Sequence, residues 1–163
     1  MQLTHDSHHS NTHSKEIIIL CDHINSPANQ GAIFRLADAF GAREIQFIGA
    51  PIDIQSARLK KTARSTQQHI AYNNYESATT QLKRLQEDGY FCLALEITDT
   101  SIPISHLQIP HNKIVLLLGN EQEGVSKDLL KEVDKTMHIP MYGQNSSMNV
   151  AQAAAIALYH ICQ

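Results

Sequence analysis

Short apolar runs separated by helix-like segments are the feature that most narrows the folds open to this chain. The first run, EIIILC at Glu16–Cys21, is continuous and rich in β-branched residues, which is typical of a strand buried on both faces. A helix-like segment that ends at Gly41 follows it, and a second strand is predicted at Glu44–Ile48. A strand, a helix and a strand in this order predict a parallel sheet, and therefore an α/β fold.

The same alternation runs through the rest of the chain, without an internal repeat. Glycines and capping residues mark the ends of the expected elements: Gly89 ends a helix, Gly119 ends a central strand and Ser126 caps the next helix. The expected elements are a helix-like segment 54–66, a short strand Ile70–Tyr72, a helix Tyr75–Asp88, a strand Tyr90–Glu96, a strand Ile114–Leu118 and a helix Lys127–Glu132. The segment that contains Pro103 and Pro110 is expected to be a loop.

The stretch Met137–Ile161 joins a short strand to an alanine-rich helix through a polar loop. The strand, Met137–Ile139, stops at Pro140, and the small residues of the helix allow close backbone approach, so we expect the helix in the core or at a subunit contact. Ser147 or Asn149 is the expected N-cap, because either side chain can accept hydrogen bonds from free amides of the first turn. Polar loops at a strand end are where α/β proteins hold ligands.

Composition indicates an ordinary globular protein rather than a membrane protein or a disulfide-framed one. The 163 residues are enough for one domain with its own core, and 42% hydrophobic with 18% charged residues is usual for that class. No apolar run approaches the ~20 residues that span a bilayer, and the polar N-terminus lacks an export signal. Three widely separated cysteines fit reduced thiols, so we expect a cytoplasmic protein with neither a disulfide frame nor a metal site.

Residues 1–15 are polar and carry several histidines, at His5, His8, His9 and His13. Nothing apolar repeats there, so the sequence predicts a flexible tail ahead of one folded domain at 16–163. Metal capture by these histidines is the alternative, and a solvated tail is the preferred interpretation.

The net charge of the chain is −3, so any contact with a nucleic acid must rest on a local basic surface. The densest unbalanced charge lies within 54–66, where no acidic residue accompanies Arg58, Lys60, Lys61 and Arg64. At helical spacing Arg58 and Lys61 share a face, as do Lys60 and Arg64. Such a ridge can meet backbone phosphates of RNA, and a solvated helix face is the alternative.

The loop Gly119–Gly124 follows an apolar strand, as a phosphate-binding loop would. However, Val125-Ser126 replaces the Lys-Ser/Thr pair of a P-loop, and Glu121 and Glu123 would repel a polyphosphate. No G-x-G-x-x-G motif follows any strand either. These observations argue against nucleoside triphosphate and dinucleotide sites.

Three segments together resemble the SpoU/TrmH family of RNA 2′-O-ribose methyltransferases, which belongs to the SPOUT superfamily. They occur in the family's order: NQGAIFRLADAFG at Asn29–Gly41, LLLGNEQEG at Leu116–Gly124 and IPMYGQNSSMNVAQAAAIAL at Ile139–Leu158. The resemblance covers residues 16–163. It implies a parallel sheet flanked by helices with a C-terminal trefoil knot, a homodimer, S-adenosylmethionine as the methyl donor, and tRNA or rRNA as the substrate.

The same resemblance implies roles for individual residues. Asn29 and Arg35 match the asparagine and the catalytic arginine of the first motif, and Glu121 matches the acidic residue of the second. Ser147 and Asn149 match the polar pair of the third motif. The cofactor would lie near Leu95, Gly119, Ile139 and Met148, the last of which stands where leucine is more usual in the family.

These residue types suit methyl transfer to a ribose hydroxyl, which is a poor nucleophile until its proton leaves. The Arg35 guanidinium stays protonated, so we expect it to stabilise the developing alkoxide or hold the adjacent phosphate. Glu121 is expected to orient Arg35 or hold the dimer edge, with a solvated loop carboxylate as the alternative. For Asn29 the alternative is a helix N-cap, and His23 is interpreted as an ordinary loop histidine rather than a base.

Two other functions stay open. An RNA-binding protein that keeps the knotted fold without catalysis is one, and the intact motif residues argue against it. A flavodoxin-like binder of a flavin or nucleotide is the other. The sequence names neither the RNA nor the methylated nucleotide. Many members of the family carry an extra RNA-binding domain before the catalytic one, where this chain has 15 residues. We therefore expect target choice to come from the surface of the domain or from a partner protein.

Overall fold

Strands and helices alternate along the chain, as the apolar pattern predicts. The computed structural model describes residues 12–163. The strands are β1 (Glu16–Asp22), β2 (Glu44–Ile48), β3 (Tyr72–Tyr75), β4 (Phe91–Leu95), β5 (Ile102–Pro103), β6 (Lys113–Leu118) and β7 (Lys135–His138). The helices are α1 (Pro27–Ala39), α2 (Ala57–Ala63), α3 (Ala78–Glu87), α4 (Lys127–Glu132) and α5 (Val150–Ile161), with short 3₁₀ helices η2 (Thr66–Gln68) and η3 (Ile104–His106).

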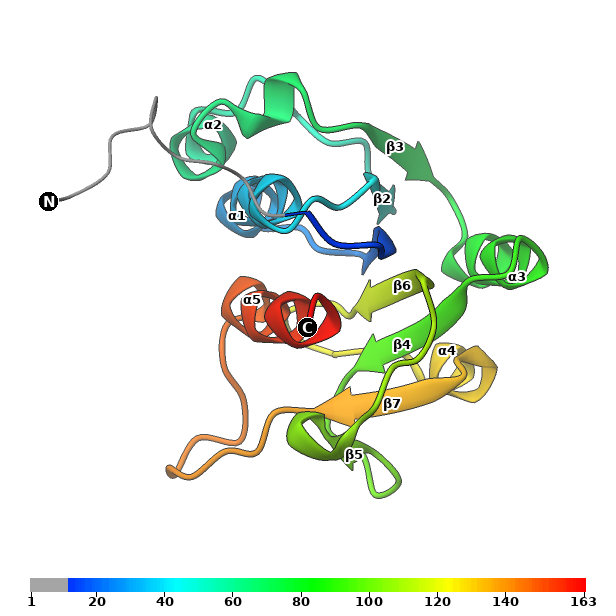
Figure 1. Cartoon of the computed structure of the whole chain (residues 1–163). Coiled ribbons are helices and arrows are strands. Elements are labelled where there is room, and N and C mark those ends of the chain that lie inside the picture. The colour runs from blue at the N-terminus through cyan, green and yellow to red at the C-terminus, as the bar shows by residue number, and fades with distance from the viewer. Residues whose placement is uncertain (1–11) are drawn as a thin grey trace, which may run out of the picture.

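The strands form one seven-stranded sheet with helices on both faces (Figure 1). Their order is β3-β2-β1-β6-β4-β7-β5, and every neighbouring pair is parallel. The predicted parallel α/β sheet flanked by helices is therefore confirmed. All strands end at the same edge of the sheet, which brings the loops that follow them together.

Alternate residues of the central strands face opposite layers of helices. In β1, Ile17 and Ile19 pack in the core that contains residues of α1 and α5, whereas Ile18 and Leu20 pack in the core that contains residues of α3 and α4. Every residue of β1 after Glu16 is buried. Burial on both faces explains why the strand reads as a continuous apolar run rather than an alternating one.

The alanine-rich helix α5 lies beside α1 on one face of the sheet (Figure 1). Ala154 and Ala157 are both 0% exposed, so the small-residue face of α5 packs inside the subunit. The expectation of a core position for this helix is confirmed. Ile156 and Tyr159 point the other way, with 41% and 60% of their surfaces exposed. A contact between subunits through α5 would therefore use this second face.

The region after β2 departs most from the predicted elements. The helix ends at Ala63, because Arg64 and Ser65 have φ values of +53° and +76° and turn the chain into η2. The next strand then begins at Tyr72 rather than Ile70. Two successive non-glycine residues in the left-handed region carry no signature in a hydrophobic pattern, which is why the helix was predicted to be longer.

The segment predicted as a loop around Pro103 contains β5 and η3. A two-residue strand at the edge of the sheet is too short to show any periodicity. At the N-terminus, residues 1–11 of the predicted tail lie outside the described residues. Of the remainder, Lys15 Nζ donates to the carbonyls of Ile109 and His111 at 2.8 and 2.7 Å. Within residues 12–163, none of the helices has the length and apolar character needed to cross a membrane.

Candidate active site

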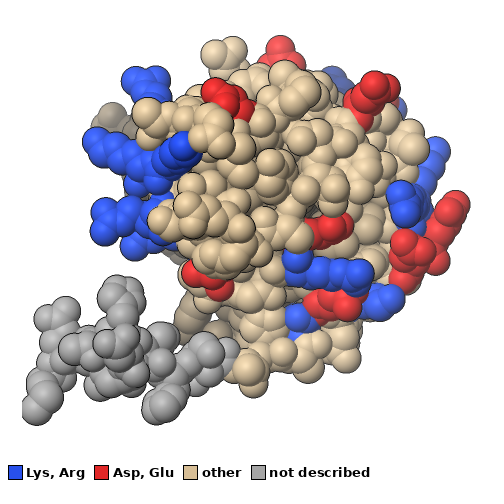
Figure 2. Space-filling view, turned by 90° about the horizontal axis from the view of Figure 1, so that it is seen from above, with Lys and Arg blue, Asp and Glu red and all other residues tan. Residues whose placement is uncertain are grey.

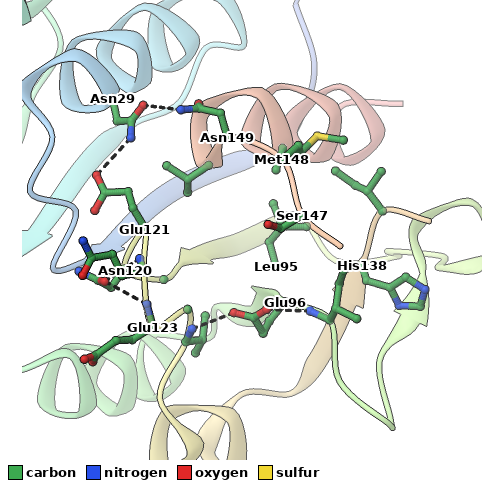
Figure 3. Close-up of a pocket in the computed structure, with 18 of the residues that line it drawn as sticks. Asn29, Leu95, Glu96, Asn120, Glu121, Glu123, His138, Ser147, Met148 and Asn149 are labelled. Carbon is green, nitrogen blue, oxygen red and sulfur yellow. Dashed lines mark hydrogen bonds between the residues drawn. The ribbon is translucent and has the colours of Figure 1, made fainter. Parts of the chain in front are cut away.

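A cavity of about 470 Å³ lies at the carboxyl edge of the sheet, among the loops that follow β4, β6 and β7. Residues 95–97, the loop 119–125 and the segment that leads into α5 form its walls (Figure 3). The crevice outside the carboxyl ends of parallel strands is where open α/β sheets bind ligands, and this volume is typical of a small-molecule site.

The cavity gathers predicted site residues from all three sequence motifs. The four positions expected to hold the cofactor line it, namely Leu95, Gly119, Ile139 and Met148. Four of the residues expected to be catalytic line it as well: Asn29, Glu121, Ser147 and Asn149. Arg35 is not among the lining residues. Residues that are up to 120 positions apart in the sequence therefore meet at one place.

A chain of hydrogen bonds joins the three motifs at the cavity (Figure 3). Asn149 Nδ2 donates to Asn29 Oδ1 at 2.9 Å, and Asn29 Nδ2 donates to Glu121 Oε1 at 3.1 Å. Asn149 Oδ1 in turn accepts from the backbone N–H groups of Ala151 and Gln152, so Asn149 is the N-cap of α5. Because the cap fixes the orientation of the Asn149 amide, it also fixes the direction of the whole chain of donors.

Glu121 closes this chain as an acceptor. Its carboxylate accepts from the backbone N–H groups of Asn25 and Ser26, at 3.2 and 3.0 Å, as well as from Asn29. Burial alone would raise the pKa of Glu121, but the hydrogen bonds from Ser26, Asn29 and Asn25 outweigh it and lower the pKa below its ordinary value. The carboxylate is therefore ionised at neutral pH and ties the loop after β6 to the start of α1.

These contacts revise two sequence-based interpretations. Glu121 was expected to orient Arg35, but the described residues that hydrogen-bond its carboxylate are Asn25, Ser26 and Asn29. The alternative role for Asn29 as a helix N-cap is wrong, because Ser26 caps α1 and accepts from the Asn29 N–H. The Asn29 side chain is free of capping and takes part in the cavity network instead.

Arg35 lies six residues after Asn29 on α1, and its side chain is exposed. Six residues are fewer than two helical turns, so Arg35 lies about 9 Å from Asn29 along the helix axis. An exposed guanidinium outside the cavity suits contact with a macromolecule that approaches from solvent. The position of Arg35 is consistent with action on the acceptor rather than on a ligand inside the cavity.

The loop after β6 is compact and depends on two glycines. A side chain at Gly119 would overlap the backbone of Gly124 and Val125, so close approach requires glycine there. Gly124 has a φ of +69° and lies against the Glu96 carboxylate, which accepts from the Val125 N–H at 2.9 Å. Asn120 Oδ1 accepts from Gln122 and Glu123 N–H groups inside the same loop.

Sequence analysis missed two residues that shape the opposite wall of the cavity. Glu96 holds the loop after β4 against the loop after β6, and its Oε1 accepts from the Ile97 N–H at 2.9 Å. His138 lines the cavity, and its Nδ1 lies 2.8 Å from Ser101 Oγ. Glu96 directly follows β4, and His138 is the last residue of β7. A position at the carboxyl edge of the sheet was the only feature of the sequence that could have indicated them as site residues. Among residues 12–163, no group of three or more His, Cys, Asp or Glu side chains is arranged to hold a metal ion.

The basic residues of the segment 54–66 lie on and just after α2, away from the cavity lining. Arg58, Lys60, Lys61 and Arg64 are all exposed. In Figure 2, Lys and Arg side chains lie at two edges of the molecule, and those at the right edge are mixed with Asp and Glu side chains. Helix α2 is fixed to α1, because a side chain at Gly31 would overlap Thr62 and Leu59, and Thr62 Oγ1 donates to Ala28 O at 2.9 Å. The basic face of α2, meaning these four residues, is thus held rigidly relative to Asn29.

The chain is similar to known enzymes that modify rRNA or tRNA. The chain is 30% identical over 147 residues to the 23S rRNA (guanosine(2553)-2′-O)-methyltransferase of Bacillus subtilis, an alignment that covers 88% of this chain and 57% of that relative. An AdoMet-bound rRNA methyltransferase from Sinorhizobium meliloti superposes with a TM-score of 0.80 and 28% identity, covering 91% of this chain and 57% of that one. The TrmH/SpoU tRNA modifying enzyme of A. aeolicus gives a TM-score of 0.79 and 25% identity, with 90% and 73% coverage.

The chain spans little more than half the length of the first two of these proteins. A family model described as the SpoU rRNA Methylase family matches residues 16–159, which contain all three sequence motifs and every residue of the cavity. The chain therefore belongs to the SpoU rRNA Methylase family.

Proposed function

We propose that this chain is an S-adenosylmethionine-dependent RNA methyltransferase that modifies a ribose 2′-hydroxyl of tRNA or rRNA. The observation that carries the proposal is the hydrogen-bonded chain Asn149–Asn29–Glu121 at a cavity on the carboxyl edge of the sheet. The names of the relatives support the same activity: one acts on 23S rRNA, and another is a tRNA (guanosine(18)-2′-O)-methyltransferase of Borreliella burgdorferi.

The cavity suits the proposed cofactor in size and charge. About 470 Å³ is enough for a nucleoside-sized ligand, and Leu95, Ile139 and Met148 offer apolar surface. Glu96, Glu121 and Glu123 line the same cavity, so it favours a ligand with positive charge. When bound, S-adenosylmethionine supplies an activated methyl group on a sulfonium. The Sinorhizobium relative was crystallised with this cofactor, which supports the assignment.

Arg35 and polar residues of the cavity wall would act on the RNA. As the methyl group moves from sulfur to the ribose oxygen, the hydroxyl loses its proton and the oxygen gains negative charge. Arg35 stays protonated, so it is suited to stabilise that charge or to hold the neighbouring phosphate. Asn29, Ser147 and Asn149 lie where the acceptor ribose would enter, and Asn29 and Asn149 are held by their mutual hydrogen bond.

RNA would bind through the basic face of α2. Arg58, Lys60, Lys61 and Arg64 are exposed, and α2 is packed against α1, the helix that carries both Asn29 and Arg35. Phosphate contacts of this kind position RNA without reading its sequence. A strand of RNA that lies along α2 would therefore be directed toward the cavity by the geometry of α1 and α2.

A trefoil knot is the topology that we propose for the C-terminal segment. Strand β7 lies between β4 and β5, which are consecutive along the chain, so the connection 96–101 crosses the end of β7. Contacts at this crossing are close: Glu96 N–H donates to Met137 O at 2.9 Å, and Ser101 contacts His138. The chain that leaves β7 must pass this connection before it reaches α5. Similarity to other family structures supports the same path.

A homodimer is the proposed assembly in the cytoplasm, with residues 1–15 as a tail ahead of the domain 16–163. Exposed Ile156 and Tyr159 on α5 would be covered by the partner subunit. Replacing both by glutamate should give monomers of unchanged fold, because neither side chain is in the core. Sedimentation analysis measures this, and a monomeric wild-type protein at micromolar concentration would exclude the dimer.

The experiment that tests the activity is methyl transfer from tritiated S-adenosylmethionine to bulk tRNA and to ribosomal RNA. Nuclease digestion of the product should yield a 2′-O-methylated nucleoside. A protein that binds RNA but transfers no methyl group, and that fails to bind the cofactor in a calorimetric titration, would support the non-catalytic alternative instead.

A further inference from the structure

His23 directly follows β1 and is held more firmly than an ordinary loop residue. Its φ is +53°, a left-handed conformation that non-glycine residues rarely adopt. Its backbone N–H donates to Ile48 O at 3.2 Å, and its carbonyl accepts from Asn120 Nδ2 at 2.7 Å. Because Asn120 also lines the cavity, the backbone of His23 is fixed to the wall of the candidate active site.

The imidazole ring is fixed as well. Its Nδ1 lies 2.7 Å from Oδ1 of Asp22, whose side chain is only 11% exposed, whereas the side chain of His23 is 55% exposed. The ring lies over Gly49, where an added Cβ would come within 2.8 Å of His23 Cδ2. A strained backbone and a tight glycine contact are features that folded proteins keep mainly at functional positions.

The hydrogen bond to Asp22 decides which chemistry the exposed ring offers. A carboxylate oxygen accepts hydrogen bonds, so the contact with Asp22 selects the tautomer with its hydrogen on Nδ1, in which Nε2 presents a lone pair. Carboxylates of Asp22 and Glu121 lie close by, since Glu121 accepts from the N–H of Asn25. Negative charge nearby disfavours a phosphate but not a hydroxyl group. The ligand that fits Nε2 is therefore an uncharged donor, and in RNA the 2′-hydroxyl is such a donor.

The position of the ring places this contact beside the acceptor rather than on it. The ring leans toward Gly49 at the end of β2, whereas the cavity lies beyond β1, at the ends of β6, β4 and β7. Neighbouring strands are about 4.8 Å apart, so the ends of β2 and β6 are separated by about 10 Å. A nucleotide next to the methylated one could therefore contact His23.

We propose that His23, oriented by Asp22, accepts a hydrogen bond from the 2′-hydroxyl of a ribose that flanks the methylated nucleotide. This proposal rests on the proposed function, and it adds to it a contact that favours RNA over DNA. Histidine would be retained in a conformation better suited to glycine because the ring makes this contact.

The test compares the affinities of the wild-type protein for a single-stranded RNA of mixed sequence and for the DNA of the same sequence. His23→Gly should weaken RNA binding about fivefold, which corresponds to a neutral hydrogen bond of about 1 kcal/mol, and leave DNA binding unchanged. Glycine adopts a φ of +53° freely, so thermal unfolding should show an intact fold. His23→Asn is a second variant, because asparagine tolerates this conformation but has a shorter side chain.

The control is His111→Asn, a change of an exposed histidine next to the amino end of β6, on the opposite edge of the sheet, and it should alter neither affinity. Equal losses of RNA and DNA affinity in the His23 variants, or no loss at all, would overturn the proposal while methyl transfer by the wild type still upholds the proposed function. A wild-type protein that transfers no methyl group to bulk RNA would overturn the proposed function itself.

Discussion

The cavity at the carboxyl edge and the basic face of α2 differ in how their residues are held. Around the cavity, Asn29, Glu121 and Asn149 come from distant parts of the chain and are fixed by mutual hydrogen bonds. On and just after α2, four cations lie within seven residues of sequence and are exposed to solvent. The first region therefore depends on the fold, and the second depends on local charge. Substitutions around the cavity should lower methyl transfer or cofactor binding strongly. Each substitution on the basic face of α2 should lower RNA affinity by a small, additive amount.

The largest effect is expected from Arg35, an exposed residue of α1, the helix that carries Asn29 and packs against α2. Arg35→Ala should lower methyl transfer by roughly 10²–10³-fold, the cost of losing one group that stabilises developing charge. Cofactor affinity should stay within a few-fold, because Arg35 does not line the cavity. Calorimetric titration and a tritium-transfer assay separate the two quantities. Arg35→Lys is the matched control. Methyl transfer at the normal rate by Arg35→Ala would show that Arg35 has no role in catalysis.

Gly119→Val should disrupt the cavity while leaving α2 unaffected. The valine side chain would overlap the backbone of Gly124 and Val125 and displace the loop after β6. A displacement of about 1 Å in such a site costs on the order of 100-fold in rate, and cofactor binding should weaken with it. Gly143→Val is the matched control, since nothing lies within 4 Å of a Cβ added there. Normal cofactor binding by a folded Gly119→Val protein would place the cofactor elsewhere.

The basic face of α2 should respond more gradually. Lys60→Ala, Lys61→Ala and Arg64→Gly together should weaken RNA binding about tenfold and make the log–log salt slope shallower by roughly 0.7 per lost phosphate contact. Glycine is used at position 64 because Arg64 has a φ of +53°. Cofactor affinity should not change.

The control for this triple variant needs cations that lie outside the basic face. Arg43 is unsuitable, because it pairs with Glu16 at 2.7 Å and contacts Tyr90. Arg84, Lys127 and Lys135 lie on α3, α4 and β7, and all three are exposed. Within residues 12–163 none of them forms an ion pair, so replacing all three by alanine gives a matched change of charge. If both triple variants changed RNA affinity and its salt slope equally, the basic face of α2 would be only a solvated helix face.

The smallest effect is expected from Glu121→Gln. Its carboxylate accepts three hydrogen bonds, and loss of the charge should lower the free energy of unfolding by about 1 kcal/mol at neutral pH. Because the folded-state pKa of Glu121 is lowered, its contribution is present above its ordinary pKa and is lost as the pH falls through the folded value. Urea unfolding of both proteins should therefore converge in acid, and a difference that grows below pH 4.5 would contradict the assigned contacts.

Apolar patterning predicted most of the fold because the central strands are buried on both faces. The bounds of β2 and α4 match the prediction residue for residue: Gly49 follows the end of β2, and Ser126 caps the start of α4. The apolar pattern did not predict β5, which has only two residues, or the left-handed residues Arg64 and Ser65. These features produce no periodicity of apolar residues in the sequence.

The candidate site could be named from sequence only by motif resemblance. Hydrogen-bond partners were beyond that method: Ser26 rather than Asn29 caps α1, and Glu121 bonds to Asn29 and to backbone N–H groups rather than to Arg35. Glu96 and His138 were not predicted as site residues, because a single carboxylate or imidazole after a strand indicates no particular function. His23 was set aside as a loop histidine, since its partner Asp22 and its contact with Gly49 exist only in the folded chain.

The measurement that tests the central claim most directly is a map of ribose 2′-O-methylation across all RNA in cells with and without this protein. The account predicts that one or a few tRNA or rRNA positions lose methylation in its absence. The wild-type chain should restore those positions, whereas the Arg35→Ala variant at equal abundance should not. An unchanged map in cells that lack the protein, or full restoration by Arg35→Ala, would contradict the account.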